Sequence, residues 1–196
     1  MTKLVFASAN EHKLQEIRSI MPANIELVGL ANVGIHEEIP ETSGTLKGNA
    51  FQKANYVFEK TALPCFSDDT GLEIDALNGR PGVNSAIYAG EPRSAERNIQ
   101  QVLVEMKSEN RRSARFKTVI CFCSPQGSFY FEGTCEGTIG RELRGEKGFG
   151  YDSIFYPQGN SRTFAEMSLS DKKLLSHRSK AFEKFLLQFP LFIAPH

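Results

Sequence analysis

The sequence lacks any long hydrophobic run and any excess of charge of one sign. No apolar stretch approaches the roughly 20 residues that span a bilayer, so we expect no transmembrane helix and no membrane partner. The 23 Lys and Arg residues equal the 23 Asp and Glu residues. A chain without a basic excess is not expected to bind nucleic acid through bulk electrostatics, whereas a small phosphorylated substrate is compatible with this balance.

Cysteine is scarce, and its spacing fits neither a zinc site nor a redox motif. The four cysteines contain no Cys-x-x-Cys pair and have no histidine at zinc spacing, so we expect free thiols that are buried or partly buried. The N-terminal segment becomes polar too early for a secretory signal peptide. The expected location is therefore cytoplasmic.

Repeats, low-complexity tracts and Pro/Ser-rich linkers are also missing, so residues 1–196 are predicted to form a single domain. Strand–helix units followed by a hairpin indicate an α/β fold with a mixed sheet. The predicted strands are 4–7, 25–30, 63–67 and 154–156, with a hairpin of 115–123 and 129–136. The predicted helices carry Leu14 to Met21, span 45–60, run from a cap at Ser94 to Met106, and run from a cap at Ser170 to Phe189 with Leu174 on the apolar face.

The residues between the first strand and the first helix, Ser8-Ala9-Asn10-Glu11-His12-Lys13, are suited to an anion. Unpaired N–H groups at a helix start attract negative charge, and Lys13 adds a positive charge for phosphate. An ordinary N-cap beside a surface lysine has the same sequence. No G-x-x-x-x-G-K-[ST] motif is present, and no G-x-G-x-x-G follows a strand, which excludes a P-loop and a dinucleotide-binding fingerprint.

Two adjacent carboxylates, Asp68 and Asp69, follow an apolar strand, with Glu41 upstream. Like charges repel, and Mg²⁺ relieves that cost because it takes one or two carboxylates and completes its shell with water and substrate phosphates. A carboxylate near the metal can also accept a proton from water. The residues alone leave a second interpretation equally open, because Asp-Asp-Thr-Gly also favours a turn.

A third group consists of Gly148-Phe149-Gly150-Tyr151-Asp152 and, further along the chain, Lys172 and Ser176-His177-Arg178. Glycines beside Phe149 would let a flat ligand approach the backbone and the ring. His and Arg can donate hydrogen bonds to a purine carbonyl or to phosphate. A glycine turn followed by a solvated basic helix face is the alternative.

Together these residues resemble the inosine/xanthosine triphosphate pyrophosphatase family, nucleotide hydrolases that remove deaminated purine nucleotides. The resemblance extends over nearly the whole chain. The matching segments are Phe6 to Asn10 with Lys13 and Glu16, Glu41-Thr42, Asn49-Ala50, Lys53-Ala54, Ser67 to Leu77, Gly79 to Val83, Ser85-Ala86, Tyr88 to Gly90, Gly148 to Asp152, Phe164 to Met167 and Ser176 to Arg178.

The resemblance implies hydrolysis of ITP, dITP and XTP to the nucleoside monophosphate and pyrophosphate, with Mg²⁺ as cofactor and a homodimer as the assembly. It also implies an ITPase-like α/β fold of the Maf/Ham1 type. In that fold a mixed central sheet is flanked by helices, and two lobes have an active-site cleft between them.

By the same resemblance, the catalytic residues are Asp69, Lys13 and Glu41, with Asp69 as the proton acceptor for the attacking water. Glu41 and Asp69 would hold the metal, and Asp68 is the alternative for either task. His177 and Arg178 would recognise the 6-oxo group of the base. All the positions that would bind phosphate, nucleoside or base are Ser8, Ala9, Asn10, Glu11, His12, Lys13, Thr70, Phe149, Gly150, Tyr151, Asp152, Lys172, His177 and Arg178.

The chain departs from the family pattern in three places. Ile87 stands where arginine is common, which removes a basic contact. Ser153 stands where proline is common, and Leu46-Lys47-Gly48 replaces the common Phe-x-Glu. None of these positions belongs to the carboxylates or to Ser-His-Arg.

Two rival functions can be tested against the same residues. A related Maf-type nucleotide pyrophosphatase, which acts on modified or pyrimidine nucleotides, would want a basic pair after the first strand, and His12-Lys13 is a poor match. A non-catalytic nucleotide-binding protein would keep the phosphate cradle but would not need Glu41 and Asp69. Their joint presence favours catalysis.

Overall fold

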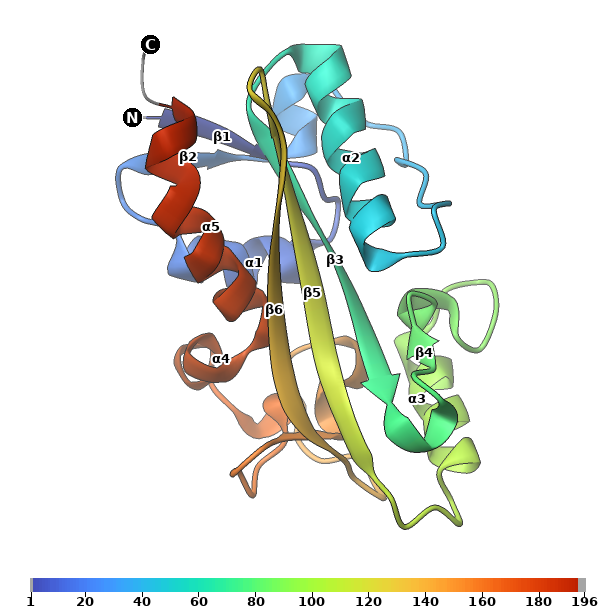
Figure 1. The fold of residues 1–196 in the computed structure, drawn as a ribbon. Coiled ribbons are helices and arrows are strands. Elements are labelled where there is room, and N and C mark those ends of the chain that lie inside the picture. Colours follow the sequence, from blue (N-terminus) through green and yellow to red (C-terminus); the bar gives the residue numbers. More distant parts are fainter. Residues whose placement is uncertain (1, 194–196) are drawn as a thin grey trace. The chain divides into compact units, whose positions relative to one another are not determined.

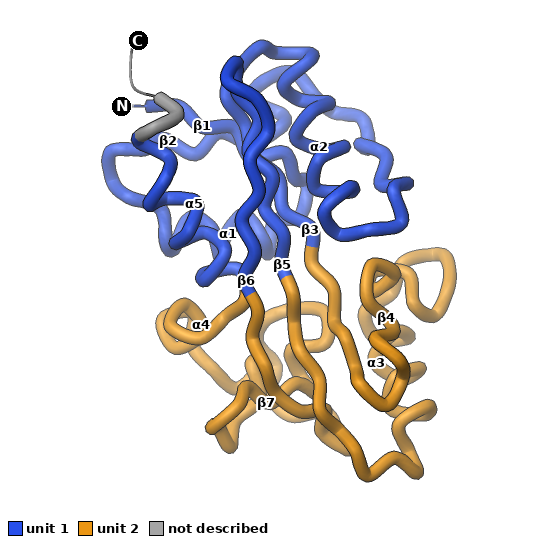
Figure 2. Tube along the Cα trace, in the orientation of Figure 1, with its two compact units in different colours: residues 1–69, 118–133, 178–196 blue, residues 70–117, 134–177 orange. Residues whose placement is uncertain are grey.

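The computed structural model describes residues 2–193 and divides the chain into two compact units (Figure 2). Unit 1 comprises residues 1–69, 118–133 and 178–196, and unit 2 comprises residues 70–117 and 134–177. Three long strands, β3 (Cys65–Ile74), β5 (Ser113–Ser124) and β6 (Gly127–Ile139), contribute residues to both units. None of the helices in the described part of the chain is both long and apolar enough to cross a bilayer.

The strands form one mixed sheet in the order β2-β1-β3-β5-β6-β7, with β4 paired to β3 (Figure 1). The shorter strands are β1 (Thr2–Phe6), β2 (Ile25–Val28), β4 (Pro81–Gly82) and β7 (Phe155–Pro157). Strand β1 runs parallel to both β2 and β3, with Val5 opposite Cys65. The β3–β4 and β6–β7 pairs are antiparallel, so the predicted mixed α/β sheet is confirmed.

Five α-helices accompany the sheet within residues 2–193: α1 (Glu11–Ile20), α2 (Leu46–Thr61), α3 (Ala95–Glu105), α4 (Leu169–Leu175) and α5 (His177–Ile193). Short 3₁₀ helices lie at Leu30–Val33, Asp75–Leu77, Ser85–Ile87, Gly150–Ser153 and Phe164–Glu166. The side chains of Asn10, Thr45 and Ser94 cap α1, α2 and α3, each accepting a hydrogen bond from the N–H three residues on.

In unit 1 both faces of the sheet are buried, because side chains of successive strand residues point to opposite faces. On one face Phe6, Phe66 and Phe122 pack against residues of α1 and α5. On the other face Val5 and Cys65 pack against alanines and Val57 of α2. Unit 2 has its own core, in which residues of α3 pack with Leu72, Phe116, Phe155 and their neighbours. Strand β3, which carries Asp68 and Asp69, is therefore held by packed side chains.

The start of α2 has an unusual cap. The Oγ of Ser43 accepts a hydrogen bond from the N–H of Thr45 at 3.2 Å, and Thr45 Oγ1 accepts one from the N–H of Gly48 at 3.0 Å. A Cβ at position 48 would lie 2.1 Å from the Ser43 Oγ. Gly48, although costly within a helix, is therefore required here by the close approach of Ser43.

The predicted final helix from Ser170 to Phe189 is wrong as a single element. The chain forms α4, capped by Ser168 rather than Ser170, and then α5, with Ser176 in an extended conformation between them (φ −70°, ψ 150°). Leu174, assigned to the apolar face of that helix, is 79% exposed. The Ser168 hydroxyl accepts from the N–H of Asp171, whose carboxylate accepts from the N–H of Ser168, and this capping box starts α4 two residues earlier.

The expectation of free, buried thiols is confirmed. All four cysteines, Cys65, Cys121, Cys123 and Cys135, are buried and unbridged. Cys121 and Cys123 share a face of β5, with their Sγ atoms 3.9 Å apart. Burial raises the pKa of the Cys65 thiol well above its ordinary value, which keeps this sulfur unreactive.

Candidate active site

Asp-Asp-Thr-Gly is not a turn, because residues 68–71 continue β3 without interruption. A Cβ at Gly71 would lie 2.5 Å from the carbonyl oxygen of Gly82. The glycine therefore permits the close approach of β4 rather than a change of chain direction. Adjacent side chains on a strand point to opposite faces, so Asp68 and Asp69 have different environments.

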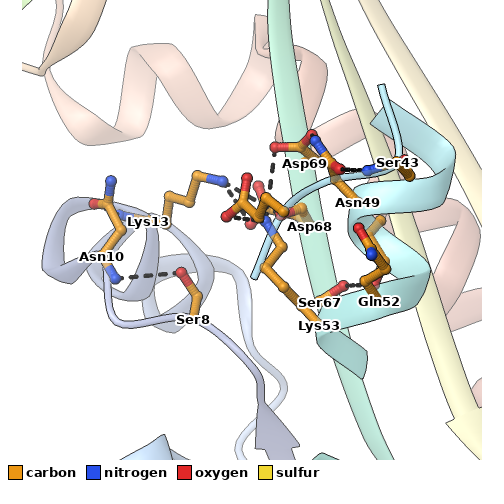
Figure 3. A network of polar contacts seen from close by, with 12 residues as sticks. Ser8, Asn10, Lys13, Ser43, Asn49, Gln52, Lys53, Ser67, Asp68 and Asp69 are labelled. Carbon is orange, nitrogen blue, oxygen red and sulfur yellow. Dashed lines mark hydrogen bonds and ion pairs between the residues drawn. The ribbon is translucent and has the colours of Figure 1, made fainter. Parts of the chain in front are cut away.

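Asp68 is completely buried, and its carboxylate is the negatively charged group in a cluster of basic side chains (Figure 3). Its Oδ1 lies 3.0 Å from Lys13 Nζ, and its Oδ2 accepts a hydrogen bond from Arg178 Nε at 2.9 Å. Burial opposes ionisation, but the charges of Lys13 and Arg178 outweigh it, so the pKa of Asp68 lies below its ordinary value. Asp68 is therefore ionised at neutral pH, and its carboxylate orients two cations.

Lys13 and Arg178 are brought together by this carboxylate. Lys13 belongs to the first turn of α1, and its Nζ also donates to the backbone oxygen of Asp68 at 3.3 Å. Arg178, at the start of α5, has a side chain only 1% exposed and also pairs with Glu16 of α1. The guanidinium is thus held in one orientation by two carboxylates.

The segment from Ser8 to Lys13 is both an N-cap and an accessible helix start. Asn10 Oδ1 accepts from the N–H of Lys13 at 3.1 Å, and Ser8 Oγ accepts from the N–H of Asn10 at 3.2 Å. Residues 9–12 are exposed. The ordinary cap and the anion-binding interpretation therefore describe the same structure, because capping leaves other N–H groups of the first turn available.

Asp69 lies in a different environment, beside α2. Its Oδ2 accepts a hydrogen bond from Asn49 Nδ2 at 3.2 Å, and its Oδ1 lies 3.6 Å from Lys53 Nζ. Burial raises the pKa of this carboxyl above its ordinary value, an effect that Lys53 only partly offsets. A carboxylate that is oriented by a neutral donor and has a raised pKa is suited to accept a proton.

Lys53 joins Asp69 to Glu41. Its Nζ donates to Glu41 Oε1 at 3.0 Å, and the carboxylates outweigh burial, so the pKa of Lys53 is raised. Asn49 and Lys53 were assigned no role from the sequence. They are polar residues four apart on the buried face of α2, among Leu46, Ala50, Ala54 and Val57, and polar groups on an apolar helix face are the signal that could have identified them.

A divalent cation fits the pair of Glu41 and Asp69. Within residues 2–193 no three His, Cys, Asp or Glu side chains are placed to hold a metal ion by themselves. Mg²⁺ needs only one or two carboxylates when water and substrate phosphates supply its other ligands. The ammonium of Lys53 contacts both carboxylates, so Lys53 brings them together, and a divalent cation bound by both would share their negative charge with this ammonium.

The other predicted residues lie in unit 2, where Asp152 contacts two of them, Phe149 and Lys172. Asp152 Oδ2 accepts hydrogen bonds from Lys172 Nζ at 2.6 Å and from the N–H of Phe149 at 2.9 Å. Lys172 Nζ also lies 5.2 Å from the centre of the Phe149 ring. This places a lysine–carboxylate pair beside an aromatic ring, on a backbone with glycines at positions 148 and 150.

The remaining predicted residues of unit 2 have structural contacts. Tyr151 is buried in the core, and its hydroxyl donates to the backbone oxygen of Ser85 at 2.9 Å. His177 is 3% exposed and stacks on Phe116 with ring centroids 4.6 Å apart. Thr70 lies on β3 and is half-buried. The substrate contacts assigned to these residues stay predictions.

We expect Gly148→Ala to destabilise the protein more than Gly150→Ala. Both glycines have positive φ, +76° and +58°, which costs another residue about 1–2 kcal/mol. Only at position 148 would a Cβ also meet an obstacle, 2.2 Å away at Asp152 Oδ2. Urea denaturation should show the larger loss for Gly148→Ala, and equal losses would contradict the structural role given to this glycine.

Comparisons with known proteins give one consistent result. The sequence pattern of the Ham1 family matches residues 4–188. A protein named dITP/XTP pyrophosphatase from Porphyromonas gingivalis is 50% identical over 182 residues, which cover 92% of this chain and 94% of that protein. One of the same name from Bacillus subtilis is 40% identical over 188 residues, covering 94% and 95%. A HAM1 protein structure from Coxiella burnetii superimposes with a TM-score of 0.87 and 36% identity, covering 97% and 100%.

Proposed function

This chain belongs to the Ham1 family, and from that membership we propose that it is a dITP/XTP pyrophosphatase. It hydrolyses the non-canonical purine nucleotides dITP, ITP and XTP to the nucleoside monophosphate and pyrophosphate. The observation that carries the proposal is the environment of Asp69, a carboxylate of raised pKa held by Asn49 and Lys53 beside Glu41.

In the proposed reaction, water attacks the α-phosphorus, and the bond between the α-phosphorus and the bridging oxygen of the β-phosphate breaks. Asp69 accepts the proton that the water loses. Asn49 fixes one oxygen of this carboxylate, and Lys53 lies near the other. Asp68 is not the proton acceptor, because its pairing with Lys13 and Arg178 keeps its pKa low.

The start of α1 and Lys13 bind the phosphates. The helix offers backbone N–H groups with the positive end of its dipole, and the exposed residues 9–12 leave them accessible. Lys13 keeps its position through Asp68. The metal is Mg²⁺, with Glu41 and Asp69 as its protein ligands; when bound it neutralises phosphate charge and makes water more acidic.

The base is recognised by the residues predicted for it. Phe149 offers an aromatic face beside the Lys172–Asp152 pair. His177 and Arg178 stay the predicted donors to the 6-oxo group, although both side chains are almost completely buried. A donor aimed at a 6-oxo group would face the 6-amino group of adenine, which costs about 1–3 kcal/mol. The cleft between two lobes, the homodimer and the cytoplasmic location stay predictions.

A pyrophosphate-release assay tests this function. We expect turnover of dITP, ITP and XTP with Mg²⁺, and loss of turnover with excess chelator. The value of kcat/KM for ATP should be at least roughly fivefold lower than for ITP, which corresponds to about 1 kcal/mol, the lower end of the cost of an unpaired donor. The same panel includes GTP and the pyrimidine triphosphates.

The panel also separates the rival functions. Equal kcat/KM for ATP and ITP would contradict the proposed recognition of the base. Preference for pyrimidine nucleotides would favour a Maf-type enzyme, and binding without turnover would favour a nucleotide-binding protein.

A further inference from the structure

Residues 40–45, which include Glu41, are held by hydrogen bonds rather than by burial. All six are exposed, and the nearest buried residues are Ile39 and Leu46. An exposed segment of this kind has little packing to fix its conformation. The orientation of Glu41 therefore depends on specific polar contacts.

Three successive residues of this segment each contact a side chain of α2. Glu41 accepts from Lys53, and the N–H of Ser43 donates to Asn49 Oδ1 at 3.0 Å. Between them, Thr42 contacts Gln52. Figure 3 shows Ser43 and Asn49 beside Asp69, with Gln52 and Lys53 further along the same helix.

The contact between Thr42 and Gln52 is reciprocal. The N–H of Thr42 donates to Gln52 Oε1, and Gln52 Nε2 donates to Thr42 Oγ1, both at 2.9 Å. Two hydrogen bonds from one planar amide fix distance and direction together, as a single bond does not. Thr42, the residue that Gln52 holds, is the immediate neighbour of Glu41.

Gln52 has no role in the proposed chemistry and lies between the family segments Asn49-Ala50 and Lys53-Ala54 without belonging to either. We propose that Gln52 is a positioning residue that clamps Thr42 so that the Glu41 carboxylate is held beside Asp69 for a divalent cation. This inference rests on the proposed function for the role of Glu41. The clamp itself is a property of the chain that can be measured without turnover.

The test compares Gln52→Leu, which removes both hydrogen bonds, with Thr42→Val, which removes only the hydroxyl contact, and Thr42→Ser, which keeps both. Asn55→Leu is the matched control, because Asn55 also loses a side-chain hydrogen bond on α2, to Glu59, but does not touch the segment. Mn²⁺ binding is followed by electron paramagnetic resonance, and the half-saturating Mg²⁺ concentration is measured with dITP.

We expect Gln52→Leu to weaken Mn²⁺ binding and raise half-saturating Mg²⁺ about tenfold, as for other residues that orient a metal ligand. Thr42→Val should change both quantities less, and Thr42→Ser and Asn55→Leu should leave both unchanged. The double variant Thr42→Val/Gln52→Leu should lose no more than Gln52→Leu alone, because both replacements remove the same contact. Unchanged Mn²⁺ binding in Gln52→Leu, the same loss in Asn55→Leu, or no Mn²⁺ binding by the unmodified chain would overturn the proposal.

The two proposals fail in different ways. If the unmodified chain releases no pyrophosphate from any nucleotide, the proposed function is wrong, and Mn²⁺ binding by the variants still decides the role of Gln52. If dITP is hydrolysed but Gln52→Leu matches the unmodified chain in both measurements, only the clamp is refuted.

Discussion

Replacement of Asp69 by asparagine is expected to lower kcat for dITP by roughly 10²–10⁴-fold while leaving the fold intact. Asparagine has the same shape but cannot accept a proton from the attacking water. The structure gives this carboxylate the raised pKa that the task requires, because it is buried and only partly compensated by Lys53. Steady-state pyrophosphate release gives kcat, and circular dichroism checks the fold.

Asp75→Asn is the matched control for this replacement. Asp75 lies in the 3₁₀ helix that follows β3, pairs with Arg115 in unit 2 rather than with Lys53 or Asn49, and has a side chain that is 32% exposed. We expect near-normal turnover for this variant. Normal turnover in Asp69→Asn would show that another group accepts the proton.

Replacement of Asp68 by asparagine is expected to destabilise the protein by about 3–5 kcal/mol, because Lys13 and Arg178 would stay buried without their shared counter-charge. Urea denaturation at neutral pH measures the loss. The lowered pKa of Asp68 also makes the free energy of unfolding of the unmodified chain depend on pH. Its stabilisation is complete above the ordinary carboxyl pKa and is lost as the pH falls below that value, toward the pKa of the folded state.

Glu16→Gln separates the two carboxylates that hold Arg178. It removes one partner of the guanidinium and leaves the pair with Asp68 in place. We expect a smaller loss of stability than in Asp68→Asn. Comparable losses in the two variants would mean that Asp68 stabilises the cluster no more than Glu16 does. A loss below about 1 kcal/mol in Asp68→Asn would refute its role as the shared counter-charge of Lys13 and Arg178.

The sequence predicts most of the strands and helices because their apolar residues have a clear period. Strand β1 and helices α1 to α3 all lie near their expected positions, and the expected cap of α3, Ser94, is the observed one. The end of the chain is different, since several serines compete as caps there. Ser168 rather than Ser170 is the cap because the carboxylate of Asp171 accepts a hydrogen bond from the N–H of Ser168. Ser176 has an extended conformation, which ends α4.

The candidate site was only partly predictable for a similar reason. The identity of Asp68 and Asp69 is visible in the sequence, but their different pKa values depend on which face of β3 each side chain occupies. Lys53 and Asn49 read as part of an ordinary helix, although both reach Asp69. Local sequence cannot show that a residue of α2 neutralises a carboxylate of the next strand, because that contact depends on packing of the helix on the sheet.

The cap at the start of α2 restricts how this region can evolve. A glutamate at the third helical position, common in the family at position 48, can accept a hydrogen bond from the capping residue's own N–H; here Ser43 accepts that bond and fills the space a side chain at position 48 would occupy. The two positions therefore cannot be exchanged independently. Any side chain at position 48 requires Ser43 to move from its present conformation, and the N–H of Thr45 then needs a new acceptor.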